Sequence, residues 1–253
     1  MSEVLISVVI PAYNEKKNIK NCLESIKEQD YQGPIEIIVC NNNSSDDTAQ
    51  IATEAGATVV FESRAGVIFA RETGTKAARG DIIVQTDADT IYAKNWISRI
   101  METFAKNPEA VAVIGSFKFF DGPWWGKPFV GLLFGITDIF YKLAGRLIYI
   151  PGANTAFKKS FFHGYNLKLD QGGDEVALLK ELKKEGKIIF VRSNAVFTSA
   201  RRLKKGLLYN IFVILIFYYI FDYTFRRITG KSIASAFPRI RDKEKNLKEI
   251  EHL

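Results

Sequence analysis

The sequence predicts an α/β fold with three layers, in which helices cover both faces of a mostly parallel central sheet. Apolar runs of strand length alternate along the chain with segments whose apolar residues recur at helical spacing. This alternation is typical of right-handed βαβ units, which build parallel sheets. Of the 253 residues, 47% are hydrophobic, so the chain can bury a sizeable core and is not disordered as a whole.

Four strand-like runs lie in the first part of the chain. Residues 4–11 are apolar, rich in β-branched side chains and closed by a proline, which favours a buried parallel strand. The other three runs are residues 35–40, 57–61 and 81–85. Between them, helical spacing places Ile19, Cys22, Leu23 and Ile26 on one face, and residues 67–78 are typical of a further helix.

Polar residues directly follow three of these strands, at residues 14–15, 41–46 and 87–89. The turn at residues 41–46 also offers side chains that can cap the next helix. Ligands of parallel sheets bind outside the carboxyl ends of the strands. We therefore expect the three polar clusters to converge on one edge of the sheet.

The pattern changes beyond Pro108, where the alternation is less regular. We expect strands at residues 111–120 and 188–191, a rigid aromatic turn at residues 123–126, and a helix at residues 175–184 that is closed by Gly186. Residues 132–149 form an apolar and aromatic segment, and residues 152–157 lead toward the pair Gly172-Gly173.

Charge and cysteine content narrow the class of protein. Lys and Arg number 35 against 28 Asp and Glu, a formal net charge of +7, which favours anionic partners such as nucleotides or membrane surfaces. Cys22 and Cys40 are too few for a disulfide scaffold and lack metal-ligand spacing, so we expect a reducing cytosol. The apolar run at residues 4–10 follows Glu3 instead of a basic region, so we expect no signal peptide.

Basic residues flank a strongly apolar segment near the C-terminus. The sequence RRLKK begins at Arg201, the apolar segment covers residues 206–225, and a lysine-rich tail follows. A span needs roughly 20 apolar residues, but this segment contains Asp222, Asn210 and four tyrosines, which prefer interfaces. We favour a helix that lies in or on an anionic membrane. The alternative that residues 206–225 form a core helix packed on the domain is not excluded.

Asp87-Ala88-Asp89 ends a hydrophobic strand and is the most informative local feature. Two carboxylates separated by one residue can share Mg²⁺ or Mn²⁺ with a ligand's phosphate oxygens. An ordinary capping turn explains the same three residues equally well. The acidic pair Asp174-Glu175 follows two glycines and begins a helix. Capping of the helix N-terminus is the simpler explanation of these acids, and it is the one we favour from the residues alone. The functional alternative is that one of them acts as a general base.

Six motifs, in the expected order, resemble the family 2 glycosyltransferases, which have a GT-A fold. They are SVVIPAYNE at residues 7–15, VCNNNSSDDT at 39–48, the arginine helix leading to GD at 70–81, TDAD at 86–89, PGANTAF at 151–157 and DEVAL at 174–178. The resemblance covers residues 4 to about 202, and six motifs in order are far more specific than any single one.

The resemblance implies a GT-A catalytic domain at residues 1–202, with a nucleotide-sugar half to about residue 110 and an acceptor half from about residue 111. Residues 203–253 would then be a basic, apolar helical tail. Residues implied to bind the nucleotide sugar are Pro11, Ala12, Tyr13, Glu15, Asn41, Asn42, Arg71, Asp87 and Ala88. Asp89, with Asp87, would hold a divalent cation, Mn²⁺ or Mg²⁺.

The resemblance also implies an inverting reaction whose base lies in the pair Asp174-Glu175. Counting back from Leu178 favours Glu175, whereas residue type favours Asp174. Two departures from the family pattern stand out: the base position is glutamate if the spacing holds, and Asn41-Asn42 replaces the usual acidic turn.

The pair Arg201-Arg202 follows the last predicted strand. Bidentate recognition of a donor or lipid phosphate and membership of a solvated basic collar explain it equally well. The aromatic residues at 117–120 and 124–125 are candidates for an acceptor wall, although such clusters are more often core. His163 lacks a placed partner and is interpreted as structural.

The leading hypothesis is a metal-dependent glycosyltransferase at the cytoplasmic face of the cell membrane, peripheral or anchored by its C-terminus. Its donor would be a UDP- or GDP-linked sugar, and its acceptor a lipid-linked or growing glycan. A transferase with a soluble acceptor is one alternative. A non-catalytic sugar-nucleotide-binding or membrane scaffold protein is another, and Asn41-Asn42 favours it. Nucleic acid is not an expected partner, because the basic residues flank an apolar segment instead of forming a stripe.

Overall fold

The computed structural model describes residues 4–145, 147, 149, 151–168, 174–201, 203, 206–209 and 225. The chain divides into two compact units, residues 1–204 and 205–253. The first unit contains the sheet and its covering helices. In the second, the described residues include one short helix, α7 (Leu207–Tyr209). The predicted apolar segment at residues 206–225 otherwise lies outside the described residues.

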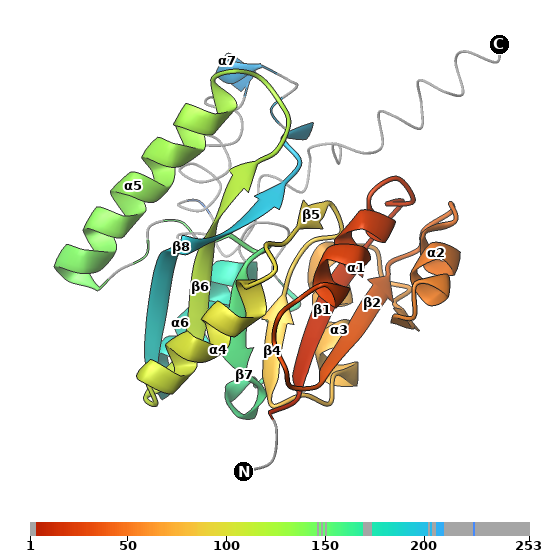
Figure 1. Cartoon of the computed structure of the whole chain (residues 1–253), viewed down its shortest axis with the longest axis horizontal. Helices are drawn as coiled ribbons and strands as arrows, with labels where there is room; N and C mark the ends of the chain where they lie inside the picture. Colours follow the sequence, from red (N-terminus) through yellow and green to blue (C-terminus); the bar gives the residue numbers. More distant parts are fainter. Residues whose placement is uncertain are drawn as a thin grey trace. The chain divides into compact units, whose positions relative to one another are not determined.

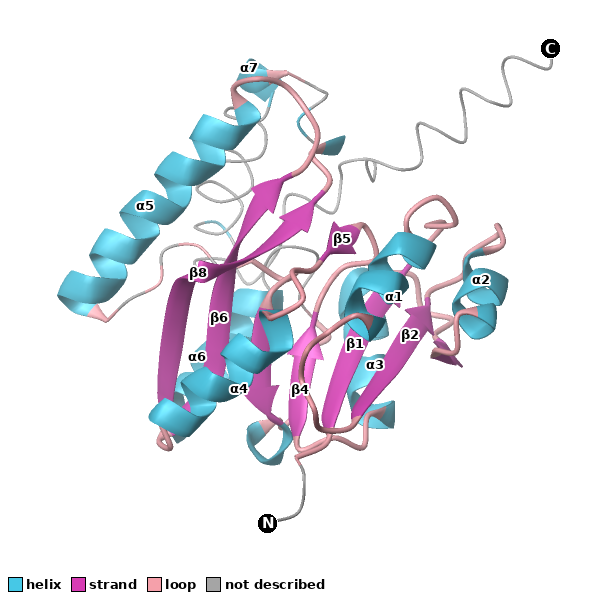
Figure 2. Ribbon diagram, viewed as in Figure 1, coloured by secondary structure: helices cyan, strands magenta, loops and turns pink. Residues whose placement is uncertain are grey.

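The first unit is built on an eight-stranded sheet in the order β3-β2-β1-β4-β7-β6-β8-β5 (Figures 1 and 2). The strands are β1 (Ile6–Ala12), β2 (Ile35–Asn41), β3 (Thr58–Phe61), β4 (Ile82–Gln85), β5 (Thr90–Ile91), β6 (Ala110–Phe119), β7 (Thr155–Lys158) and β8 (Lys187–Thr198). Strands β1 to β4 are mutually parallel, and β8 is parallel to β6. Antiparallel pairing enters at β7, between β4 and β6, and at β5, beside β8.

Helices cover both faces of this sheet, which confirms the three-layer prediction (Figure 2). The helices are α1 (Ile19–Lys27), α2 (Thr48–Glu54), α3 (Val67–Ala77), α4 (Trp96–Lys106), α5 (Gly126–Ala144) and α6 (Asp174–Glu185), with a 3₁₀ turn at Lys159–Phe161. One apolar cluster joins α1, α2 and α4 to the sheet, and a second joins α3, α5 and α6 to it. Alternating residues of β1 enter opposite clusters, because successive side chains of a strand point to opposite faces.

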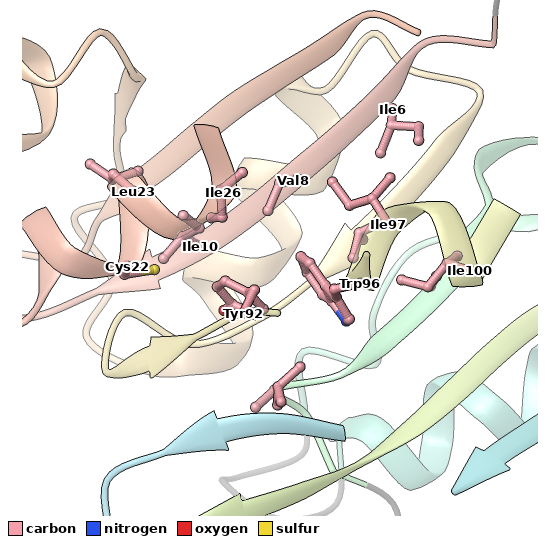
Figure 3. Packing of buried hydrophobic residues seen from close by; sticks show 14 of the residues in the cluster. Ile6, Val8, Ile10, Cys22, Leu23, Ile26, Tyr92, Trp96, Ile97 and Ile100 are labelled. Atoms are coloured by element: carbon pink, nitrogen blue, oxygen red, sulfur yellow. The ribbon is translucent and has the colours of Figure 1, made fainter. Parts of the chain in front are cut away.

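The first cluster supports the loop that follows β4 (Figure 3). Trp96 is fully buried, stacks on Tyr92 with ring centroids 4.0 Å apart, and donates its indole N–H to Asn154 Oδ1 at 2.9 Å. Asn154 also donates to the backbone oxygens of Ser116 and Asn194. A buried polar group of this kind stabilises only when its hydrogen bonds are made. Here they tie β7, β6 and β8 together beneath the loop.

Several elements differ from the sequence prediction. The last strand was expected at residues 188–191 but continues to Thr198, past a register shift opposite Gly115 and Ser116 that lets the polar residues 192–194 interrupt the pattern. Helix α4 and the short strand β5 were not predicted, and the segment expected at residues 132–149 is largely the helix α5, which begins earlier, at Gly126.

Candidate active site

The Asp87-Ala88-Asp89 turn lies between β4 and β5, at the carboxyl edge of the parallel strands. Two buried side chains fix the backbone of this turn. The backbone oxygen of Asp87 accepts hydrogen bonds from Cys22 Sγ at 3.7 Å and from the Tyr92 hydroxyl at 3.4 Å. Burial raises the pKa of Cys22 and of Tyr92 well above their ordinary values, so both stay protonated as donors. Ala88 is buried in the same cluster. The turn therefore presents its two carboxylates from a fixed backbone.

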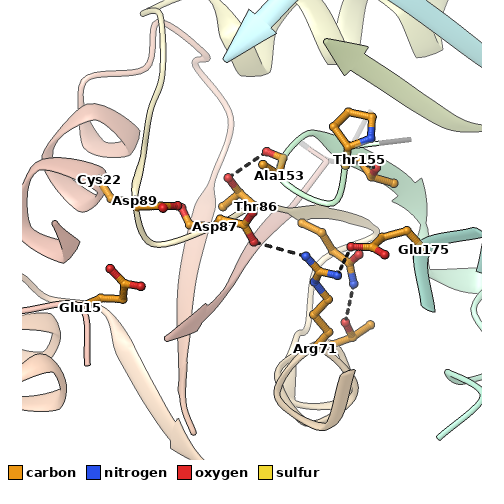
Figure 4. Close-up of polar contacts among 12 residues, drawn as sticks. Glu15, Cys22, Arg71, Thr86, Asp87, Asp89, Ala153, Thr155 and Glu175 are labelled. Carbon is orange, nitrogen blue, oxygen red and sulfur yellow. Dashed lines mark hydrogen bonds and ion pairs between the residues drawn. The ribbon is translucent and has the colours of Figure 1, made fainter. Parts of the chain in front are cut away.

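Arg71 of α3 joins the turn to helix α6 (Figure 4). Its guanidinium lies 3.2 Å from Asp87 Oδ1 through Nη2 and pairs with Glu175 Oε1 through Nη1. The Arg71 side chain is only 3% exposed, and Gly152 lies directly against the ion pair. A Cβ at position 152 would overlap both Glu175 Oε1 and the guanidinium, so a larger residue there would displace at least one of the two paired groups.

A second arginine bridge lies on the other side of the same turn. Arg201 Nη2 is 2.7 Å from Asp89 Oδ2 and 2.6 Å from Glu15 Oε1, and its Nη1 donates to Glu15 Oε2 at 3.1 Å. Burial by itself would lower the pKa of Arg201, but the hydrogen bonds that Arg201 donates to Glu15 and the negative charge of Asp89 outweigh burial, so that pKa is raised. The backbone N–H of Ser199 also donates to the Asp89 carbonyl at 3.2 Å, which brings the end of β8 to the turn.

The loops after β1 and β2 interlock beside these carboxylates. Asn14 Oδ1 accepts from the backbone N–H of Ser45 at 2.8 Å, and the backbone N–H of Glu15 donates to Thr48 Oγ1 at 2.8 Å. Asn14 has a φ of 52°, a left-handed conformation that asparagine tolerates better than most residues. Asp46, in the predicted capping turn, accepts from the backbone N–H of Thr48 at 3.1 Å. The structure thus brings two of the predicted polar clusters into direct contact.

Asn41 and Asn42 have different surroundings. Asn42 donates to the backbone oxygens of Glu62 at 2.9 Å and Arg64 at 2.7 Å, and its Oδ1 accepts from the backbone N–H of Gly66 at 2.8 Å. Its amide therefore holds the loop between β3 and α3, the helix that carries Arg71. Asn41 Oδ1 accepts from the backbone N–H of Ser44 at 3.0 Å, within the turn itself.

Replacing Asn42 by aspartate is expected to lower the free energy of unfolding. A carboxylate cannot donate to the Glu62 and Arg64 oxygens, and an unmade buried hydrogen bond costs about 1–3 kcal/mol. Chemical denaturation of Asn42→Asp beside Asn43→Asp, whose amide is exposed and donates to the Ser63 oxygen, measures this. Equal stability of the two variants would contradict the assigned role.

Glu62 anchors the same loop and makes it sensitive to acid. Hydrogen bonds from the Arg64 side chain, with others from Thr73 and the Arg64 backbone, lower the pKa of Glu62 to about 2 from 4.5 despite its burial. A carboxyl whose pKa is lowered by folding stabilises the fold above its unfolded pKa and loses that contribution as the pH falls. The stability difference between wild type and Glu62→Gln should therefore shrink as the pH falls from about 4.5 toward about 2. Thermal unfolding across that range measures it, and a constant difference would argue against it.

Most of the predicted site residues lie at this edge of the sheet. Residues joined by the two arginine bridges are Glu15, Arg71, Asp87, Asp89, Glu175 and Arg201. Pro11, Ala12, Tyr13 and Asn41 lie at the ends of β1 and β2, and Ala12 accepts a backbone hydrogen bond from Asn42. Arg202 and the side chain of Asp174 lie outside the described residues. His163 is exposed, with Nε2 3.4 Å from Glu185 Oε1.

Sequence reasoning did not identify the residues that hold the site residues in place. Tyr92 and Cys22 hold the turn, and Gly152 makes room for the Arg71–Glu175 pair. Gly152 belongs to the motif at residues 151–157, but its neighbours along the chain do not indicate that it packs against a side chain of α6. The apolar spacing of Trp96, Ile97, Ile100 and Phe104 was a usable signal for α4.

The carboxylates suit a divalent cation only in part. Within the described ranges, no group of three or more His, Cys, Asp and Glu side chains is placed to hold a metal ion by itself. Asp87 and Asp89 each contact a guanidinium, so both positions attract positive charge. Mg²⁺ usually takes one or two carboxylates and completes its ligands with phosphates and water. The donor set therefore fits a cation that arrives with a phosphate-bearing ligand.

The fold is the GT-A fold, as the likeness to solved structures shows. TarS residues 1–349 of S. aureus align over 79% of this chain and 60% of their own, with a TM-score of 0.64 and 19% identity. The mannosyltransferase PcManGT of Pyrobaculum calidifontis, in complex with GDP-Man and Mn²⁺, covers 80% of this chain and 58% of its own (TM-score 0.60, 22% identity). Glucosyl-3-phosphoglycerate synthase of Mycobacterium tuberculosis, with Mn²⁺ and UDP-glucose, covers 80% and 74% (0.60, 22%).

The chain belongs to glycosyltransferase family 2, whose model matches residues 7–165. Glycosyltransferase GlyG of Streptococcus pneumoniae is 28% identical, over 77% of this chain and 70% of its own. The uncharacterized glycosyltransferase YfnE of Bacillus subtilis is 32% identical over 44% of this chain, which spans only 29% of that protein. A glucosyl-dolichyl phosphate glucuronosyltransferase of Haloferax volcanii is 25% identical over 67% of this chain and 58% of its own.

Proposed function

We propose that this chain is an inverting glycosyltransferase that uses a UDP- or GDP-linked sugar. The observation that supports this most is the convergence of four carboxylates and two guanidiniums on one turn, Asp87-Ala88-Asp89, at the carboxyl edge of the sheet. Such an edge is where α/β sheets bind nucleotides. Structural relatives with UDP-glucose or GDP-Man are consistent with either base.

In this proposal the ends of β1 and β2 hold the nucleoside. Pro11, Ala12, Tyr13 and Glu15 line the base and ribose, together with Asn41 of the second strand. An asparagine amide can both donate to and accept from a base edge, so Asn41 is compatible with uracil or guanine. Asn42 contributes indirectly, since its amide holds the loop before α3.

Asp89, with Asp87, would hold Mn²⁺ or Mg²⁺ together with the donor's diphosphate. Two structural relatives were solved in complex with both Mn²⁺ and a sugar nucleotide. When bound, such a cation neutralises the charge that develops on the departing diphosphate. The chain's own part is to keep the two carboxylates in place through the fixed backbone of the turn.

Glu175 is the proposed general base. Its carboxylate lies at the start of α6 and pairs with Arg71, which also contacts Asp87 and so links base to donor site. Glu175 takes the proton of an acceptor hydroxyl as that oxygen attacks the anomeric carbon. The bond from that carbon to the diphosphate oxygen breaks on the opposite face, which inverts the configuration. A phosphate acceptor would attack in the same way without giving up a proton.

Arg201 is proposed to bind the donor diphosphate, since it already lies between Glu15 and Asp89. Charge-assisted, bidentate bonds of arginine to phosphate are strong. Arg201→Ala is therefore expected to weaken binding of UDP or GDP by about tenfold or more, as measured by calorimetry in the presence of Mn²⁺. Arg99→Ala is the matched control, because Arg99 bonds Ser193 on the surface. Unchanged nucleotide affinity in Arg201→Ala would count against this role.

The acceptor is proposed to be lipid-linked, with the enzyme at the cytoplasmic face of the cell membrane. Support comes from the basic and apolar sequence after Arg201 and from a relative whose name includes dolichyl phosphate. In the part of the chain that the structure describes, no helix combines the length and the apolar character that crossing a bilayer requires.

Release of nucleoside diphosphate from a panel of UDP- and GDP-sugars tests the proposed reaction. The panel is run with Mn²⁺, Mg²⁺ or EDTA, and with no acceptor, a membrane lipid extract or a soluble glycan as acceptor. Binding of UDP and GDP is measured alongside. We expect release from one donor, dependent on metal and raised by the lipid extract. Binding of nucleotide without release from any donor would instead favour the scaffold alternative. Release that a soluble glycan raises, and the lipid extract does not, would overturn the lipid acceptor alone.

A further inference from the structure

Helix α5 carries apolar side chains on both of its faces. The inward face packs on the sheet through Val130 and Phe134, which are buried, and Phe134 contacts Phe117 of β6 and Phe190 of β8. These contacts fix the rotation of α5 about its own axis, so the same face of the helix is always turned toward the sheet. In Figure 1 it lies along the outer side of the β6 and β8 end of the sheet.

The outward face of α5 is also apolar. Five large side chains are between 39% and 83% exposed: Leu132, Ile136, Ile139, Phe140 and Leu143. Their spacing of three or four residues puts them on one continuous stripe, called here the α5 stripe. The charged residues of α5 are Lys127, Asp138 and Lys142, and Asp138 is neutralised by Lys142 at 2.7 Å. A soluble helix places polar residues on its outer face, and an exposed apolar stripe marks an interaction surface.

A groove of about 360 Å³ runs between α5 and the ends of β6 and β8. Its floor is apolar and includes Phe117, Phe119, Val130, Phe134 and Phe197. Three cations line it, namely Lys118, Lys127 and Arg192, and all three are exposed. Arg192 Nη2 donates to the backbone oxygen of Gly131 on α5 at 3.2 Å, which fixes a positive charge beside the helix. Among the described residues, none of those that line this groove is acidic.

We propose that the α5 stripe docks this protein on an anionic lipid bilayer. An amphipathic helix with an apolar face and flanking basic residues lies in the interface, with its apolar side chains at the acyl boundary. Arg192, which is bonded to the helix backbone at Gly131, would then meet lipid phosphates beside the helix, and a cation near the membrane surface adds to the attraction. This surface lies in the first unit of the chain, residues 1–204. It also does not depend on the transfer reaction, because vesicle binding needs neither donor nor acceptor.

Co-sedimentation of the full chain with vesicles tests the proposal. The vesicles contain equal parts of phosphatidylglycerol and phosphatidylcholine, or phosphatidylcholine alone. We expect binding to the anionic vesicles, weakened by salt, and a loss of about tenfold or more in the double variant Ile139→Glu, Leu143→Glu. The matched control is Thr58→Glu, Phe61→Glu, which adds the same charge at exposed positions of β3, the strand at the other end of the sheet order.

Two results would overturn the proposal: wild type that does not bind anionic vesicles, or an α5 variant that binds them as well as the control does. The second result would show that another surface of the chain binds the vesicles. Sedimentation velocity without lipid tests the alternative occupant, a second copy of the chain. If the α5 variant turns a dimer into a monomer and leaves vesicle binding unchanged, the stripe is a dimer interface and the membrane proposal fails.

A second measurement does not depend on the charged variant folding. Cys22 and Cys40 are buried, so an environment-sensitive dye attached to Leu143→Cys labels the stripe selectively. We expect its emission to shift to the blue with anionic vesicles, whereas the same dye on Phe61→Cys should not shift. No shift at position 143, in protein that sediments with vesicles, would also overturn the proposal.

Discussion

Replacing Asp89 by alanine is expected to lower nucleoside-diphosphate release by at least about 10³-fold, roughly 4 kcal/mol of transition-state stabilisation. Asp89 contacts Arg201, and through Arg201 it is joined to Glu15, so it lies where the cation and the diphosphate are proposed to meet. Its removal takes away a proposed metal ligand and leaves Arg201 with Glu15 as its remaining partner in this bridge. The loss should appear in the metal requirement as well as in the rate.

Steady-state release and Mn²⁺ binding, followed by electron paramagnetic resonance with UDP or GDP present, measure the two effects separately. Asp30→Ala is a suitable control, because Asp30 is exposed in the loop before β2 and bonds Ser98. Asp89→Ala that keeps full release and full metal dependence would remove Asp89 from the site.

Replacing Glu175 by glutamine is expected to lower kcat by about 10²- to 10⁴-fold while the donor KM changes little. The amide keeps the shape of the side chain but cannot take the acceptor's proton. Arg71 still has Asp87 as a partner, so the nucleotide side of the site is expected to remain formed. A variant that loses kcat and donor affinity together would instead indicate that the Arg71–Glu175 pair is structural.

Two further variants separate the base from its neighbours. Glu185→Gln, in the last turn of the same helix, is the control for a lost carboxylate on α6. Asp174→Asn tests the other member of the acidic pair, and we expect it to cost less than Glu175→Gln. If Asp174→Asn carries most of the loss, the base is Asp174 and the spacing from Leu178 was the wrong guide.

Local sequence patterns predicted the helices and strands whose formation depends mainly on residues close together in the chain. The strands β1 to β4 and the helices α1 and α3 agree with the sequence prediction to within one or two residues, because their apolar spacing is regular and their ends carry turn residues. Where two signals compete, prediction was less successful. Strand β8 contains polar residues at 192–194 that fit a loop, yet its pairing with β6 carries it to Thr198.

Burial on α5 could not be predicted in the same way. Both faces of that helix are apolar, so the sequence does not distinguish Phe134, which packs on the sheet, from Leu143, which is 83% exposed. Only the position of β6 and β8 beneath the helix decides which face is covered.

By itself, the sequence determined the alternation of strands and helices, and it placed the acidic and amide residues after strands, because periodicity and turn chemistry act between near neighbours. The tertiary structure decided which of these residues meet. Arg71 and Glu175 are 104 residues apart in sequence, and Arg201 and Glu15 are 186 apart. Contacts across such distances follow from the order and register of all eight strands and from packing of helices against them, and no short stretch of sequence contains that information.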